Sequence, residues 1–578
     1  MPAPDINIQK ALRWLLERLQ ASEQYCNPYF ERAKRHYRLY RFGSAVDADD
    51  WPYVNRVRSR DILAFIEDST AIMMATLFAK MPFFSVMPRE TSVMMQKYNN
   101  IDTKSLGDQI SRCLDYQISH EDTEFFEEIT DFFKGGGIHG TSYIGVYPKF
   151  DDDGQYYLPL LKTIDFWDVL PLSGARRITK TRGLFVREWA SIEAVKELGK
   201  AKIYKNTDQL RSNINAGGDS SQEWHKTLLQ DIGMTGWAMD DNDVEVINYF
   251  SGGHIITIGD RRVILRDSNG QDKPFPYDMP IVQYKFMPVP LEFYGMGIPE
   301  VLEALQEDKN LIRSARRDNI DLAINKILKA KSGSDLNFDL FKWYAGAIWP
   351  MENLTDIEEM QVQDVTASSY QEEAMREHDM ENALSLFGYA RGMTPQHSEQ
   401  PTTVMKLQQA SLNRLDLAIK LAEFTTLQNI ARKIIMLTRK YMKPKTYEAI
   451  IGEQDAGFFK LSEEDISRFF YFKPVGSSVT NIKELRQSQI QTALQTALSI
   501  DPNMRINNVE PYTLNLLHAE KEMYEAVDIQ GVDRMLVKLP TPEEIAKEEQ
   551  EQQQMNSFTP DMNGLGALQN VPYGGENG

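Results

Sequence analysis

The chain has 578 residues, 42% of them hydrophobic and 25% charged, with a formal net charge of -19 and an isoelectric point of about 5.1. This composition excludes the disordered and fibrous classes, and the length predicts about three or four domain-sized units. Proteins that coat nucleic acid without sequence preference need a cationic surface, so the acidic balance disfavours that class. It leaves room for DNA that passes nearby, because an acidic wall repels DNA and prevents it from adhering.

The cysteines and the apolar runs indicate an intracellular, soluble protein. Cys26 and Cys113 are the only cysteines, which fits a reducing compartment and no disulfide framework. Charged residues interrupt the apolar stripe of residues 1–20, unlike the core of a signal peptide. The longest apolar run, residues 71–79, is about half of what a membrane span needs, so no membrane association is expected.

Residues 1–297 are predicted to begin with helices. Apolar residues keep helical spacing over Ile8–Leu19 and again over Phe30–Tyr40, and residues 43–55 follow as a loop. The next helix should close before Pro82 and lead into a short extended piece.

Another helix is expected over residues 102–133, with the glycines at 135–137 ending it. The glycine-rich stretch 134–141 lacks the Gly-Lys-Ser/Thr ending of a phosphate-binding loop, so a helix end and turn is the better interpretation.

From residue 141 to residue 286 the hydrophobic period approaches two, which is typical of strands. A hairpin is expected around the Asp153-Gly154 pair, and a short helix capped by Ser191 should follow a strand. The strands are expected over residues 141–150, 155–163, 183–190, 243–250, 254–260 and 261–268, the last three as a meander. The region is therefore predicted to be an α+β domain with antiparallel sheet.

A long helix should then begin at residue 298 and end at residue 330. Gly297 is suited to its N-cap and Pro299 to its first turn, and the length is roughly 50 Å at 1.5 Å per residue. Its second half is basic, with Asp318 and Asp321 as the only acids. The basic residues there are Arg313, Arg316, Arg317, Lys326, Lys329 and Lys331. They could form a solvated face, pair with acids of another subunit, or contact DNA.

The rest of the chain alternates between helices and breaks. A compact aromatic insert is expected over residues 331–365, a returning helix over 366–388 and a polar loop over 389–403. A very long helix, Val404–Met442, and a strand should fill residues 404–480, with Phe424, Leu427, Ile430, Ile434 and Tyr441 as the buried stripe. Helices are expected within residues 481–539, and an acidic, disordered tail over 540–578.

No set of residues predicts catalysis or metal binding. Asp151, Asp152 and Asp153 are better explained by the hairpin turn than by a nuclease metal site, because neighbouring residues of a strand point to opposite faces. The eight histidines show no metal-ligand spacing, and no nucleophile-base set can be assembled. We therefore expect neither an enzyme nor a cofactor.

The order of elements resembles that of the portal (head-to-tail connector) proteins of tailed bacteriophages, in particular the short-tailed, podovirus-like type. Similar stretches include "FYGMGIPEVLEALQEDKNLIRSARRDN" at the start of the long helix and "PTTVMKLQQASLNRL" at the start of the later one. The resemblance covers most of residues 59–499. The insert at 331–365 is short for the family, and the tail lacks the long helix of an extended barrel.

The resemblance implies a portal fold with a helical stem, an α/β wing, a small clip and a helical crown, assembled as a closed ring. Residues 1–297 correspond to the N-terminal wing, 298–330 and 366–388 to the stem, 331–365 to the clip, 389–403 to the tunnel loop, 404–480 to the long wing helix and strand, and 481–539 to the crown. The tunnel-loop residues that would line the DNA channel are Arg391, Thr394, Gln396, His397, Ser398, Glu399 and Gln400. The clip residues that would dock partners are Phe338, Phe341, Trp343, Tyr344 and Trp349.

The resemblance also implies the function and the partners. The chain would form a dodecameric channel at one capsid vertex of the virion, assembled in the host cytoplasm, through which double-stranded DNA is packaged and ejected. The terminase large subunit would dock first and hydrolyse ATP, and head-tail adaptor and tail proteins would replace it; major capsid and scaffolding proteins would surround the ring. The alternatives are an internal virion or scaffolding protein and a DNA-packaging enzyme subunit, although a Walker A sequence is missing.

Overall fold

The computed structural model describes residues 6–46, 49–79, 81–89, 94, 97–98, 102–151, 153–210, 220–233, 243–268, 275–325, 327–330, 357–360, 366–384, 413–455 and 457–475. The chain divides into two units, residues 1–480 and 481–578, and every described residue belongs to the first. The helices predicted within 481–539 and the acidic tail therefore lie outside the described residues.

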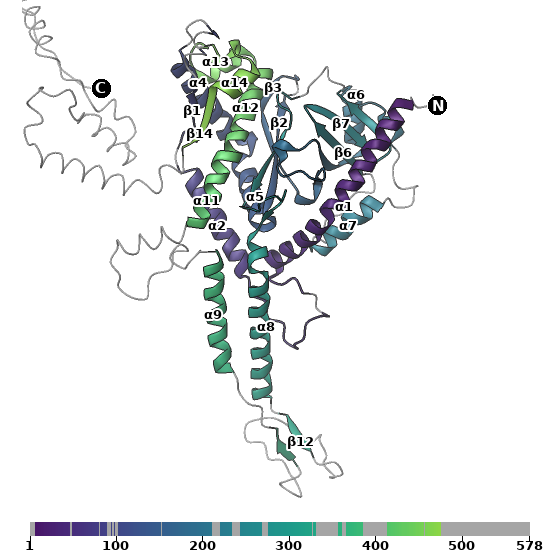
Figure 1. Cartoon of the computed structure of the whole chain (residues 1–578), viewed down its shortest axis with the longest axis vertical. Helices are drawn as coiled ribbons and strands as arrows, with labels where there is room; N and C mark the ends of the chain where they lie inside the picture. Colours follow the sequence, from purple (N-terminus) through teal and green to yellow (C-terminus); the bar gives the residue numbers. More distant parts are fainter. Residues whose placement is uncertain are drawn as a thin grey trace, which may run out of the picture. The chain divides into compact units, whose positions relative to one another are not determined.

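The two N-terminal apolar stretches belong to one helix. α1 runs from Ile6 to Phe42 (Figure 1). Leu15, Leu19 and Phe30 are buried among the residues of a β-sheet, which confirms the predicted helical spacing. Burying this stripe removes apolar surface from water and holds α1 along the sheet.

Two antiparallel sheets follow, as the period of two predicts. One has the strand order β4-β5-β6-β7-β8, the other the order β3-β2-β9. Their bounds are β2 Thr141–Phe150, β3 Tyr156–Ile164, β4 Val169–Pro171, β5 Leu184–Ser191, β6 Asp243–Ser251, β7 His254–Gly259, β8 Val263–Asp267 and β9 Ile281–Lys285. The hairpin turn is confirmed, with Gly154 at φ +71°, and so is the meander from β6 to β8.

Shorter elements connect the sheets. The helix predicted after β5 is confirmed as α6, where the Ser191 hydroxyl accepts a hydrogen bond from the Ala194 amide. The bounds are α6 Ile192–Lys200, α7 Ser220–Asp231, β10 Met287–Pro288 and β11 Gly295–Met296, with 3-10 turns at Glu121–Thr123, Phe166–Asp168, Ile178–Lys180, Thr207–Gln209 and Phe458–Lys460.

The single helix predicted over residues 102–133 is wrong. α4, Thr103–Ser119, ends before a 3-10 turn, and α5 then runs from Phe125 to His139, so the glycines at 135–137 lie inside a helix. A Cβ on Gly136 would lie 2.7 Å from the Tyr284 ring, so the helix can approach β9 only because this residue has no side chain. The helix ends instead at Gly140, which has φ +77°.

The C-terminal part of the first unit completes its core. β14, Phe470–Pro474, pairs antiparallel with β1, Phe84–Pro88, which confirms the strand predicted there. The helices of this core are α2 Asp61–Leu77, α11 Asn413–Leu421, α12 Gln428–Tyr441, α13 Pro444–Ile451 and α14 Glu463–Phe469. One core cluster joins residues from α2 through α14.

The stripe predicted for the late long helix is partly wrong. A π-helical turn, Ala422–Leu427, joins α11 to α12. Leu427, Ile430 and Ile434 are buried as predicted, but Phe424 is 55% exposed. Phe424 lies within this π turn, which holds more residues than an α turn, so its side chain points in another direction than α-helical spacing predicts. Residues 404–412 lie outside the described residues.

The described part thus mixes helices with antiparallel sheets, in agreement with the predicted α+β class. No helix in the described residues combines the length and the apolar character that crossing a bilayer requires.

Candidate functional site

Two helices predicted as the stem lie side by side. The first of them carries Arg313, Arg316 and Arg317, three of the basic residues predicted to contact DNA or a neighbouring subunit. α8 runs from Ile298 to Ile324 and α9 from Thr366 to Leu384 (Figure 1). Gly297 is the N-cap of α8, as predicted, and Pro299 lies in its first turn. A Cβ on Gly297 would lie 2.6 Å from the carbonyl oxygen of Ile138, so α8 begins in close backbone contact with the end of α5.

The predicted length of the first stem helix is wrong at its far end. α8 ends at Ile324, not at residue 330, and Leu328–Ala330 forms β12, which pairs antiparallel with β13, Ile357–Glu359. The strand pairing competes with continuation of the helix, because it satisfies the same backbone groups. Lys329 therefore lies in this small hairpin, opposite Glu358, rather than on the helix.

Two of the predicted stem arginines pair with α9 of the same chain. Arg313 and Arg316 both donate to the carboxylate of Glu373, the second at 2.6 Å. Burial alone would raise the pKa of Glu373, but the hydrogen bonds from the two guanidinium groups outweigh it and lower the pKa. These two arginines hold α9 against α8, so neither is freely available to DNA.

Two further ion pairs between α8 and α9 extend this contact toward the start of α8. Lys309, almost fully buried, reaches Glu377 of α9 at 2.7 Å, and it also reaches Asp61 of α2 at 3.0 Å. Arg376 donates to Asp308 at 2.6 Å. Charge-assisted hydrogen bonds, which are stronger than neutral ones, therefore join the two helices, and Met380 and Leu384 of α9 are in addition buried in the apolar core.

Arg317 is different, because its side chain is 57% exposed. Within the described residues, its ion pair is with Asp321, four residues along the same helix, at 3.4 Å. Of the stem residues predicted to contact DNA or a neighbouring subunit, Arg317 and Lys329 are the described ones whose side chains face solvent. Lys326 and Lys331 lie outside the described residues.

A second partner of α8 was missed by the sequence analysis. The segment 43–62, which we call the collar segment, lies along α8 and is held by polar side chains of the helix. The Asp318 carboxylate accepts from the amides of Val54 and Asn55 at 2.9 and 2.8 Å. The remaining contacts are Val57 to Ser314 at 3.0 Å, Ser59 to Asn310 at 2.8 Å and Ile62 to Gln306 at 2.9 Å.

One feature of the sequence could have indicated this contact. Gln306, Asn310 and Ser314 recur every four residues and therefore share one face of the helix. All three are buried. A buried polar row on a helix needs hydrogen-bond partners, and the extended backbone of the collar segment supplies them.

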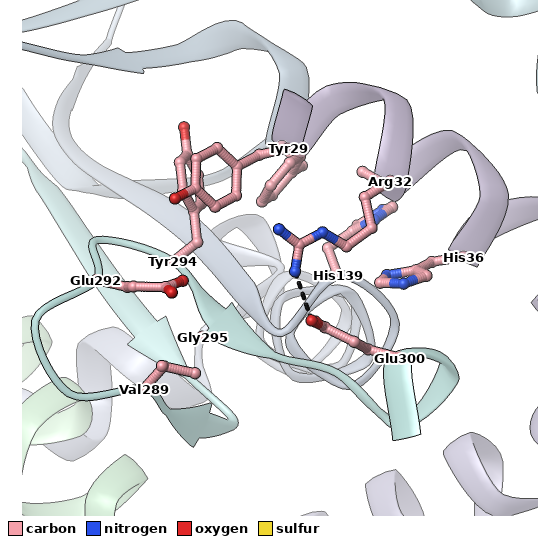
Figure 2. A pocket seen from close by; sticks show the side chains of 11 residues that line it. Tyr29, Arg32, His36, His139, Val289, Glu292, Tyr294, Gly295 and Glu300 are labelled. Atoms are coloured by element: carbon pink, nitrogen blue, oxygen red, sulfur yellow. Dashed lines mark hydrogen bonds and ion pairs between the residues drawn. The ribbon is translucent and has the colours of Figure 1, made fainter. Parts of the chain in front are cut away.

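A small pocket lies at the root of the stem, between α1, the end of α5 and the start of α8 (Figure 2). Arg32 of α1 pairs with Glu300 of α8 across it. Among the described residues, both ring nitrogens of His36 and the Nδ1 atom of His139 have no hydrogen-bond partner. Its volume of about 20 Å³ suits one water-sized molecule, far below what a substrate site needs.

Burial sets the protonation of these two imidazoles. Burial, followed by the positive charges of Arg32 and Arg35, lowers the pKa of His36 to about 3. Burial and then the charge of His36 lower the pKa of His139 to about 3 as well. Both rings are therefore neutral near pH 7, and the pocket is best described as a joint between three helices.

The other predicted site residues lie outside the described residues. This holds for the tunnel-loop residues within 389–403 and for the aromatic clip residues within 338–349. In the described part of the chain, no group of three or more histidine, cysteine or carboxylate side chains is arranged to hold a metal ion. No protein-family model matches the chain, and no curated protein matches it.

Proposed function

We propose that this chain is a portal protein of a tailed bacteriophage, a ring-forming and non-enzymatic channel for double-stranded DNA at one capsid vertex. The proposal rests on the resemblance of residues 59–499 to that family and on one structural observation, the surface of the stem. The terminase motor, the head-tail adaptors, and the capsid and scaffolding proteins would be its partners.

The supporting observation is that the stem leaves apolar side chains uncovered by the rest of the described chain. Ile324, Tyr370 and Met375 are 68%, 58% and 59% exposed. α8 and α9 use their shared face for ion pairs and for the contact of the Tyr370 ring with Arg316, and more than half of each of these apolar side chains stays outside that contact. A closed cyclic oligomer covers such surfaces with neighbouring subunits, whereas a monomer leaves them in water.

The charge of the chain fits passive transport of DNA. A net charge of -19 repels a polyanion, and the two stem arginines that could bind phosphate tightly are instead paired with Glu373. Weak contacts from the loop over 389–403 and from exposed residues such as Arg317 would then guide DNA without holding it.

Light scattering and negative-stain imaging of the purified full chain test the proposal. Closed rings of about twelve subunits with a central hole are expected. Open filaments would favour the scaffolding alternative, and a chain that stays monomeric, or that hydrolyses ATP or cuts DNA, would contradict the proposal.

A further inference from the structure

The collar segment and α9 lie on different sides of α8. In Figure 1 the collar loop, coloured dark purple, and α9 flank the helix from opposite directions. On α8, Gln306, Asn310 and Ser314 bind the collar, and Lys309, Arg313 and Arg316 bind α9. At about 100° per residue, the two sets are centred roughly a quarter of the helix circumference apart. The stem hairpin therefore presents the collar on one flank and α9 on another.

The two flanks differ in charge along part of the collar. The whole collar, residues 43–62, holds four aspartates and three arginines, but its stretch 51–60 contains Arg56, Arg58 and Arg60 and no acidic residue. Arg58 and Arg60 are exposed, and neither forms an ion pair within the described part of the chain. α9 contains five carboxylates against a single arginine, and Glu372 and Asp379 remain 53% and 47% exposed.

The two flanks also present apolar side chains. Val54 at the tip of the collar is 95% exposed, although its amide is fixed by Asp318. Fixing the backbone of a valine costs conformational entropy, and an exposed side chain gives no hydrophobic stabilisation in return. Such a residue is therefore suited to a contact in which a partner buries its side chain. On α9 the matching residues are Tyr370 and Met375, both more than half exposed.

Both flanks follow the same stretch of α8. The collar is bound from Asp318 near Val54 up to Gln306 near Ile62. α9 is bound from Arg316, whose guanidinium lies 4.1 Å from the centre of the Tyr370 ring, up to Lys309 at Glu377. Rotation about a ring axis leaves height along that axis unchanged, so surfaces at matching height can meet between neighbouring copies.

From the charge, the exposed apolar residues and the matching height, we infer that the collar of one copy docks on α9 of the next copy. Tyr53 and Val54 pack against Tyr370 and Met375, and Arg58 and Arg60 pair with the exposed carboxylates of α9. The contact joins two different surfaces and therefore propagates around a ring. This inference rests on the proposed function, because it names the subunit contact of the proposed ring.

Cysteine cross-linking tests the contact. Val54→Cys is combined with Gln371→Cys, an exposed α9 position on the side facing away from Glu373, and treated with a short bis-maleimide. The native Cys26 and Cys113 are buried and give little background. A head-to-tail contact yields a ladder of covalent multimers beyond the dimer, whereas a symmetric contact stops at two. The matched control pairs Gln371→Cys with Ile203→Cys, which is exposed but lies far from the stem in sequence.

The outcomes separate this inference from the proposed function. Closed rings that give a ladder with the Val54→Cys and Gln371→Cys pair, and no ladder with the control pair, support both the collar contact and the portal proposal. Rings without a ladder overturn the collar contact and leave the portal proposal standing, and monomers without a ladder overturn both. As a second measurement, Arg58→Glu with Arg60→Glu should weaken assembly roughly fivefold per arginine, about 1 kcal/mol each, and leave monomer unfolding unchanged. Unweakened ring assembly in this variant would overturn the charge pairing.

Discussion

At the scale of single residues, the absence of a side chain at Gly136 lets α5 lie close to the Tyr284 ring of β9. Glycine inside a helix costs roughly 0.5–1 kcal/mol relative to alanine, so three in succession need a reason. Gly136 faces the Tyr284 ring, and the ring occupies the space of the missing Cβ. Gly135, its neighbour, would place a Cβ at an ordinary 3.6 Å from the nearest atom, the Cβ of Ser142.

Alanine substitution should therefore have opposite effects at these two positions. We expect Gly136→Ala to lower the free energy of unfolding by about 1–3 kcal/mol, because the buried ring cannot move freely. Gly135→Ala should raise it by roughly 0.5–1 kcal/mol, because only the helix propensity changes. Urea unfolding of both variants measures the difference, and equal shifts in the same direction would show that Tyr284 does not restrict the helix.

His36 makes stability depend on pH. Its folded pKa of about 3 lies below the usual value near 6.5. Between these values the unfolded chain binds a proton that the folded chain does not, so stability is present above pH 6.5 and is lost as the pH falls toward 3. For His36 alone the loss from pH 7 to pH 5 is about 2 kcal/mol.

We expect His36→Leu to flatten the pH dependence of unfolding between pH 5 and pH 7 by up to about 2 kcal/mol. Denaturant midpoints across that range measure it. His254→Leu is the control, because His254 is exposed and its removal should leave the slope unchanged. Because the pKa of His139 is lowered as well, part of the slope should remain in the His36 variant, and only an undiminished slope would assign the acid sensitivity entirely to other groups.

At the scale of elements, the neighbouring stem residues Arg316 and Arg317 differ in exposure and in the partners they bind. Arg316 is 12% exposed and shares Glu373 with Arg313, while Arg317 faces solvent. We expect Arg316→Glu to lower the free energy of unfolding by about 2–4 kcal/mol, because it places a carboxylate beside a partly buried one. Arg317→Glu should change it by less than about 0.5 kcal/mol.

Hydrogen exchange of the α9 amides, together with unfolding, distinguishes these two arginines. Faster exchange along α9 is expected for Arg316→Glu only. In assembled particles, Arg317→Glu would then report on subunit or DNA contacts without a folding defect, measured as genome retention. Normal α9 protection in the Arg316 variant would show that the Glu373 pairs do not hold the stem together.

The sequence predicts the elements that depend on local pattern and misses those that depend on distant partners. The hairpin at Gly154 and the capped α6 follow from neighbouring residues, and both are confirmed. The glycines of α5 and the buried face of α8 owe their conformations to Tyr284 and to the collar segment, far away in the chain. Of the predicted site residues, those of the stem helices lie within the described part of the chain. Arg313 and Arg316 are less exposed than Arg317 because they pair with Glu373 of α9.

At the scale of the whole molecule, the first unit closes on itself before its C-terminal boundary. β14 supplies the partner strand of β1, so residues near the start and the end of the unit share one sheet. α13 and α14 add buried aromatic residues: Tyr447 stacks on Phe458 at 4.8 Å between ring centres, and Phe469 is buried. The described core thus needs no residue beyond Val475 to pair its strands.

A chain that ends after Thr480 should therefore fold, while one that ends after Tyr441 should not. Removing residues 442–480 exposes the partners of Tyr447, Phe458, Ile466, Phe469, Phe470 and Phe472, each worth about 1.5–3 kcal/mol when buried. Their sum is comparable to or larger than the typical net stability of about 5–15 kcal/mol, so the shorter chain cannot retain this core. Circular dichroism and urea unfolding measure both truncations. Cooperative unfolding of the shorter chain would mean that β14 is not required to hold β1, and loss of structure in the longer one would mean that residues 481–578 take part in the fold of the first unit.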